Sequence, residues 1–160
     1  MKKLILVRHA KSSWEFNTED HKRPLKSRGY RDAHLVFNEL KGKIFPDLIM
    51  SSDATRAKTT AELYATISNT NKDDIILNNM LYDFSGSNLV QVVKNCNNSV
   101  NVLMIFGHNN AITNFVNTYG DIIIDNVPTC GATIIEFYID YWAHLNKGKT
   151  IKTLFPRDLK

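Results

Sequence analysis

The sequence predicts an α/β protein, a three-layer α/β/α sandwich with a mainly parallel central sheet. Short β-branched apolar runs alternate along the chain with segments whose apolar residues recur at helical spacing, as strands and crossover helices do. Several of these runs end abruptly in charged or polar residues, which is typical of strands that reach the carboxyl edge of a parallel sheet. With 160 residues, 43% of them apolar, the chain is expected to form one domain over 1–160.

Strand and helix signals follow one another in a regular order. The expected strands lie at 4–7, 47–52, 74–77, 102–106, 133–138 and 149–154. The expected helices lie at 27–40, 55–67, 89–96 and 110–119.

The first elements depend on apolar periodicity. Residues 4–7 are an unbroken apolar run, and the polar stretch 10–26 that follows is expected to be a loop. The helix at 27–40 carries apolar residues every three or four positions, and Gly42 ends it. The run at 47–52 then leads into the second helix.

The later elements depend on caps and on alternation. Asp53 or Thr55 can cap the second helix, and Ser87 can cap the third. The alternating run 133–138 is typical of an edge strand, and 149–154 can pair with it as a hairpin.

The net charge of +4 is unevenly distributed. Residues 1–31 hold nine Lys or Arg against three Asp or Glu, whereas the rest of the chain carries a net charge of −2. This basic segment is either a solvated face or an entrance that attracts an acidic or phosphorylated partner. A nucleic-acid surface requires a basic stripe with aromatic stacking partners or a known module, and neither is recognisable, so no nucleic-acid partner is expected.

No membrane association is expected either. The longest apolar runs have five or six residues, against about 18 needed to span a bilayer. Arg8 also follows Met1 too closely for the apolar core of a signal peptide. We therefore expect a soluble protein of the cytoplasm.

Cationic side chains follow three of the expected strands. Arg8 and His9 come directly after the first strand, and His108 comes after the fourth. Arg56 lies in the first turn of the helix that follows the second strand. Because parallel strands end at the same edge of a sheet, these four side chains are expected to converge on a site for a compact dianion such as a phosphoryl group.

Four short motifs occur in order along the chain. They are Leu6-Val7-Arg8-His9-Ala10, Arg23-Pro24-Leu25 followed by Arg28-Gly29, Ser51-Ser52-Asp53-Ala54-Thr55-Arg56-Ala57-Lys58-Thr59-Thr60-Ala61, and Phe106-Gly107-His108-Asn109. Together they resemble the histidine phosphatase superfamily, with its phosphoglycerate mutase-like fold, and in particular the small bacterial branch of SixA-like phosphohistidine phosphatases. The first motif has Ala10 where the family signature has Gly.

The resemblance implies a role for each side chain at the matching position. His9 would be the nucleophile that becomes phosphorylated, and Arg8 and Arg56 would hold the phosphoryl oxygens. His108 would be the second histidine of the pocket.

The resemblance also directs attention to three further residues. The family's usual acid follows the third strand, where Asp83 is the nearest carboxyl group. Arg23 belongs to a segment that lies near the pocket in the family, and Ser13 follows the nucleophile closely. We expect Asp83 to act as the acid, and Arg23 and Ser13 to contact phosphate or substrate.

These residue types suit phosphoryl transfer. A neutral imidazole can attack a phosphoryl dianion that would repel an anionic nucleophile. Planar guanidiniums bind the oxygens of the transferred group and stay charged at any working pH. With a protonated His108 they would supply the charge that a metal ion supplies elsewhere, so we expect neither a metal nor another cofactor.

The predicted function is a metal-independent phosphatase that works through a phosphohistidine intermediate. A domain without insertions leaves its pocket open, which favours phosphohistidine on a partner protein, such as a histidine phosphotransfer domain. Imidazole is also a good leaving group that needs little help from an acid. The alternatives are a broad phosphomonoesterase acting on small phosphate esters and a non-catalytic module that binds phosphorylated ligands.

Overall fold

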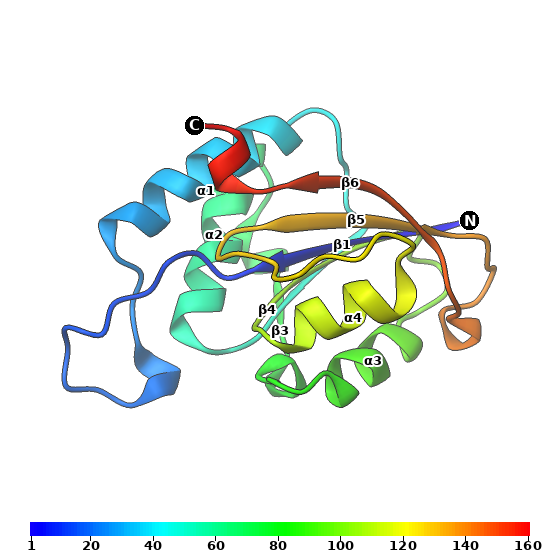
Figure 1. Cartoon of the computed structure of the whole chain (residues 1–160), viewed down its shortest axis with the longest axis horizontal. Coiled ribbons are helices and arrows are strands. Elements are labelled where there is room, and N and C mark those ends of the chain that lie inside the picture. Colours follow the sequence, from blue (N-terminus) through cyan, green and yellow to red (C-terminus); the bar gives the residue numbers. More distant parts are fainter.

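The computed structural model describes all 160 residues and confirms the predicted α/β sandwich (Figure 1). Its six-stranded sheet has the order β3-β2-β4-β1-β5-β6. The strands are β1 (Lys2–Arg8), β2 (Leu48–Ser51), β3 (Ile76–Leu77), β4 (Val102–Gly107), β5 (Ala132–Phe137) and β6 (Lys149–Leu154). The helices are α1 (Ser27–Leu40), α2 (Thr55–Ser68), α3 (Ser87–Lys94) and α4 (Ala111–Tyr119). Single-turn 3-10 helices are η1 (Asp20–Lys22), η2 (Lys72–Asp74), η3 (Asn79–Leu81), η4 (Trp142–His144) and η5 (Pro156–Asp158).

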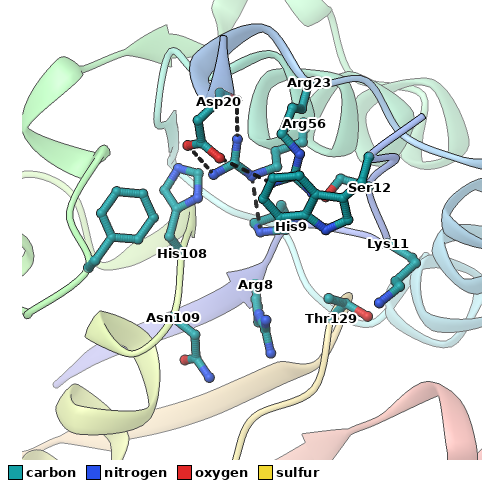
Figure 2. A pocket seen from close by; sticks show the side chains of 12 residues that line it. Arg8, His9, Lys11, Ser12, Asp20, Arg23, Arg56, His108, Asn109 and Thr129 are labelled. Carbon is teal, nitrogen blue, oxygen red and sulfur yellow. Dashed lines mark hydrogen bonds and ion pairs between the residues drawn. The ribbon is translucent and has the colours of Figure 1, made fainter. Parts of the chain in front are cut away.

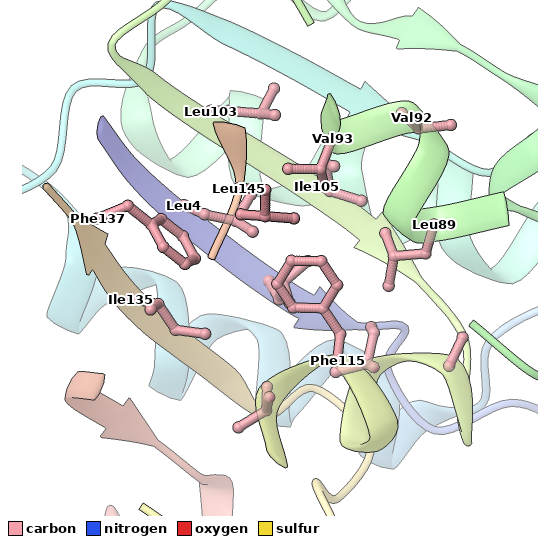
Figure 3. Packing of buried hydrophobic residues seen from close by; sticks show 14 of the residues in the cluster. Leu4, Leu89, Val92, Val93, Leu103, Ile105, Phe115, Ile135, Phe137 and Leu145 are labelled. Carbon is pink, nitrogen blue, oxygen red and sulfur yellow. The ribbon is translucent and has the colours of Figure 1, made fainter. Parts of the chain in front are cut away.

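The side chains of β1 alternate between two cores, one on each face of the sheet. Leu4 and Leu6 pack with residues of α3 and α4 (Figure 3), whereas Ile5 and Val7 pack with residues of α1 and α2. All four of these side chains are fully buried, and each contributes roughly 1.5–3 kcal/mol by leaving water. This burial on both faces explains why the strand is an unbroken apolar run.

The sheet is parallel in one part and antiparallel in the other. β1 pairs with β4, β4 with β2 and β2 with β3 in parallel, while β5 pairs antiparallel with both β1 and β6. The expectation that 133–138 is an edge strand was therefore wrong, because β6 covers its outer side and is itself the edge. Alternation along a strand reports which face a side chain occupies, and it does not report whether the strand has a second neighbour.

Two expected caps and one expected strand also differ from the structure. No side chain caps the first residues of α2, whose N-cap is Ala54, and the N-cap of α3 is Gly86 rather than Ser87. Gly86 has a φ of 117°, which favours glycine. The third strand has only two residues because residues 72–74 form the turn η2.

None of the helices has the length and apolar character required to cross a bilayer.

Candidate active site

A pocket of about 310 Å³ lies at the carboxyl ends of β1, β4 and the segment after β2. β4 lies between β1 and β2 in the sheet, so the residues that follow these three strands meet at one edge. Arg8 is aligned with Gly107 across β1 and β4, which brings the following histidines close together. The lining residues are Arg8, His9, Lys11, Ser12, Trp14, Asp20, Arg23, Arg56, Phe84, His108, Asn109 and Thr129 (Figure 2).

His9 is held in one tautomer. Its Nδ1 lies 2.8 Å from the carbonyl oxygen of Ala10, which can only accept, so Nδ1 carries the proton. Its Nε2 lies 3.4 Å from Nε of Arg56 and accepts a hydrogen bond from it. Burial lowers the pKa of His9 to about 3, more than the hydrogen bond to Ala10 raises it. The imidazole is therefore neutral at neutral pH, and the nitrogen that can attack phosphorus is Nε2.

Two guanidiniums flank this histidine. Arg56 is almost fully buried, and it donates from Nη1 and Nη2 to the backbone oxygen and the carboxylate of Asp20, at 2.7 and 3.0 Å. Figure 2 shows Arg56 connected in this way to both Asp20 and His9. Arg8 donates from Nη1 to the carbonyl oxygen of Val127 at 2.9 Å, and its buried Nε has no partner. An unpaired donor in a cationic pocket is suited to an oxygen of a bound anion.

His108 faces His9, with 5.2 Å between the two ring centroids. Its Nε2 lies 2.8 Å from Oγ of Ser52, and its buried Nδ1 has no partner. Burial and the charge of Arg56 lower the pKa of His108 to about 3. The expectation of a protonated His108 was therefore wrong, because the sequence shows the positive charges but not the loss of water around the ring.

Arg23 reaches the pocket from the loop before α1. Its Nη2 donates to Oγ of Ser12 at 2.6 Å, and its Nη1 forms an ion pair with Asp20 at 3.1 Å. The ring of Trp14 stacks on its guanidinium, with 3.2 Å from Cζ to the ring centroid. The structure thus brings together Arg8, His9, Arg23, Arg56 and His108.

Asp20 is a pocket residue that the sequence analysis missed. It lies in η1, and its Oδ2 accepts hydrogen bonds from Arg56 and from the hydroxyl of Tyr82, the latter at 2.6 Å. Burial opposes its ionisation, but the hydrogen bonds from Tyr82, Arg56 and Arg23 hold its pKa well below the ordinary value. The sequence did contain one signal for it: Asp20 lies three residues before Arg23, in the loop that holds one of the motifs shared with the family.

Asp83 and Ser13 do not line the pocket. The carboxylate of Asp83 accepts hydrogen bonds from the backbone nitrogens of Ser85, Gly86 and Leu89, so it caps the start of α3. Burial raises its pKa, but these hydrogen bonds outweigh that effect and lower it. Such a carboxyl group is a poor proton donor, and its expected role as the acid does not fit this geometry.

Ser13 lies beside the pocket in a neighbouring hollow. Its Oγ accepts a hydrogen bond from the backbone nitrogen of Glu15 at 3.1 Å. The serine that lines the pocket is the preceding one, Ser12. No group of three or more His, Cys, Asp or Glu side chains in the structure is arranged to hold a metal ion.

Comparisons with known proteins agree with the motifs. The sequence profile of the histidine phosphatase superfamily (branch 1) matches residues 4–85. An uncharacterized chloroplastic protein of Arabidopsis thaliana is 28% identical over 151 residues, which cover 88% of this chain and 69% of that protein.

Solved structures share the fold at low sequence identity. The protein histidine phosphatase SixA in complex with tungstate has a TM-score of 0.79 and 19% identity, with 99% of both chains covered. A protein of Agrobacterium tumefaciens provisionally named phosphohistidine phosphatase SixA has a TM-score of 0.76 and 22% identity, covering 96% of this chain and 97% of that one.

Proposed function

Because this chain belongs to the histidine phosphatase superfamily (branch 1), we propose that it is a phosphatase that carries the phosphoryl group on His9 and releases it to water. Its substrate is phosphohistidine on a partner protein, and residues 1–160 act as one catalytic domain. The neutral state of His9 carries this proposal: Nδ1 donates to the carbonyl oxygen of Ala10, and Nε2 carries an unprotonated electron pair that accepts a long hydrogen bond from Arg56.

Transfer takes place in two steps. In the first step, Nε2 of His9 bonds to phosphorus as the bond from phosphorus to the substrate nitrogen breaks. The substrate imidazole leaves as a neutral ring, because its other nitrogen already carries a proton, and His9 keeps its proton on Nδ1. In the second step, water attacks phosphorus as the bond to Nε2 breaks; both protons of the water leave with the product, dihydrogen phosphate, and His9 returns to its neutral form. Arg8 and Arg56 stabilise the charge on the oxygens in both steps, and each charge-assisted hydrogen bond contributes about 1.5–3 kcal/mol.

The state of the carboxyl groups supports a substrate with a good leaving group. Asp20 is the carboxylate that lines the pocket, and its ion pairs keep it ionised. The carboxylate of Asp83 accepts hydrogen bonds from backbone nitrogens at the start of α3. Imidazole leaves without a strong acid, whereas an alkoxide needs a proton, so phosphohistidine suits this pocket better than an alkyl ester.

The phosphoryl charge is balanced by side chains in this proposal, and the reaction needs no metal. Arg8, Arg23 and Arg56 surround the space next to His9. His108 lies beside this space, with its Nε2 hydrogen-bonded to Oγ of Ser52 and its buried Nδ1 without a partner. We expect full activity in EDTA.

The second candidate function is hydrolysis of small phosphate esters. A pocket of about 310 Å³ is at the small end of ligand-binding cavities, and it is large enough for a compact ester. Relative kcat/KM on a phosphohistidine protein, p-nitrophenyl phosphate and sugar phosphates separates the two. A higher value on sugar phosphates would favour this second function.

The decisive experiment combines turnover with trapping. Wild type in EDTA should release phosphate from a phosphohistidine protein, and a rapid quench in alkali should trap a labelled, acid-labile phosphoenzyme. His9→Ala should lose the label and at least about a thousandfold in rate. His34→Ala, which removes an exposed histidine of α1, is the matched control and should behave as wild type. Binding of phosphate without turnover or label would show a binding module instead.

A further inference from the structure

Exposed aromatic rings lie outside the pocket, in and after the loop at 10–26. Phe16 is 61% exposed and Tyr30 is 44% exposed, and with Leu25 they line a second hollow of about 360 Å³. Ser12 lines the pocket and Ser13 lines this hollow, so the two cavities are neighbours. Figure 1 shows the loop projecting beyond the end of β1.

Nothing in phosphoryl transfer requires these rings. Neither Phe16 nor Tyr30 lines the pocket, and both leave much apolar surface in water. Clustered exposed apolar surface in a folded protein marks a contact site more often than a scattered residue does. The hollow is of a size to accept one or two apolar side chains of another molecule.

The loop that borders the hollow carries two lysines without acidic partners. Lys26 lines the hollow, Lys22 is exposed in the same loop, and neither forms an ion pair. Of the three acidic residues among the first 31, Asp20 is already paired with Arg56 and Arg23. The ammonium groups of Lys22 and Lys26 are therefore left without acidic partners inside the chain.

We propose that this hollow docks an acidic protein and thereby presents its phosphohistidine to the pocket. An apolar side chain of the partner fills the space between Phe16 and Tyr30, while its carboxylates lie against Lys22 and Lys26. Glu15 also lines the hollow, so the carboxylates of the partner are placed on its Lys26 side, away from Glu15. The inference rests on the proposed function and names the surface that selects the partner.

The test compares a protein substrate with a small one. The protein probe is an acidic phosphotransfer domain phosphorylated on histidine with phosphoramidate, and the small probe is p-nitrophenyl phosphate. The double variant Phe16→Ser/Tyr30→Ser and the variant Lys26→Glu should each lower kcat/KM on the protein about tenfold. Both should leave kcat/KM on the small probe unchanged, because these residues lie outside the pocket. Chemically phosphorylated histone, a basic phosphohistidine protein, should be a poorer substrate than the acidic domain.

Matched controls lie at the other edge of the sheet. Phe45 is 73% exposed and precedes the start of β2, and Lys147 is exposed just before β6. Phe45→Ser and Lys147→Glu should turn over both probes as wild type does.

Three outcomes would overturn the docking proposal. They are an unchanged kcat/KM on the acidic domain in all variants, an equal loss on both probes, and equal wild-type turnover of the acidic domain and histone. Wild type that hydrolyses neither the phosphoproteins nor p-nitrophenyl phosphate would instead overturn the proposed function, so the two failures are distinguishable.

Discussion

Replacing Asp20 by Asn should tighten the binding of inorganic phosphate. The carboxylate bonds Arg56 at 3.0 Å and Arg23 at 3.1 Å, so it competes with phosphate for both guanidiniums. A phosphoryl group beside Nε2 of His9 would lie roughly 6 Å from this carboxylate, given that Arg56 spans the two. Its side chain is 42% exposed, so an effective dielectric near that of water applies. The repulsion between the single negative charge of the carboxylate and the two negative charges of phosphate then costs about 1–2 kcal/mol. Removing it should tighten the binding of phosphate roughly 5–30-fold.

The assay is inhibition of p-nitrophenyl phosphate hydrolysis by inorganic phosphate, supported by titration calorimetry. Asn keeps an oxygen that accepts from Arg56, so the loop stays anchored while the charge is lost. Asp53→Asn is the control. The Oδ1 of Asp53 lies 3.0 Å from Nε2 of His21, the residue next to Asp20 in η1, but Asp53 does not line the pocket. If Asp20→Asn bound phosphate as weakly as the wild type or more weakly, the carboxylate would not be a competitor for the anion site.

Three further predictions concern the groups around the pocket. In the folded protein His9 and His108 have pKa values of about 3, against an ordinary 6.5, so these two side chains take up protons between pH 7 and pH 5 only in the unfolded chain. The free energy of unfolding, measured with urea, should therefore decrease by about 2 kcal/mol per histidine from pH 7 to pH 5. A His9→Gln/His108→Gln variant should lose this pH dependence. Asp83→Ala should lower the free energy of unfolding by about 1–3 kcal/mol in the same assay, because it removes the cap of α3, and it should change kcat little. A large fall in kcat at unchanged stability would instead support Asp83 as the acid. Arg56→Lys should lower kcat/KM by about 10²–10³-fold, because a single ammonium group cannot replace three directed N–H donors. The circular dichroism spectrum should stay unchanged, and retention of most activity would contradict this prediction.

The order of strands and helices was predictable because burial on both faces of the sheet leaves unbroken apolar runs. The same runs explain why the convergence of Arg8, His9, Arg56 and His108 could be anticipated, since each lies at the carboxyl end of a parallel strand or shortly after it. The hairpin of 133–138 with 149–154 was predicted and is confirmed by the antiparallel pairing of β5 with β6. The second partner of β5, strand β1, was not predictable from alternation, because that contact involves backbone groups that every residue carries.

Asp20 and Asp83 show where sequence reasoning lacks information. The loop that holds Asp20 has no periodicity, and its position is decided by ion pairs with Arg56 and Arg23 that lie outside any local pattern. Asp83 was chosen for its place after the third strand, although the Ser-Gly-Ser sequence that follows it is equally typical of a helix start. The neutral state of His108 depends on burial, which composition does not reveal.

The position of β4 in the sheet has a consequence for how the protein acquires its structure. Strands β1 and β2 are made first on the ribosome, yet neither can pair with the other, because the strand that joins them is β4. Sheet closure must therefore wait for residues about a hundred positions downstream of His9, and such long-range pairing slows folding. Enzymatic activity should consequently be among the last properties to appear during refolding, after helical signal has recovered.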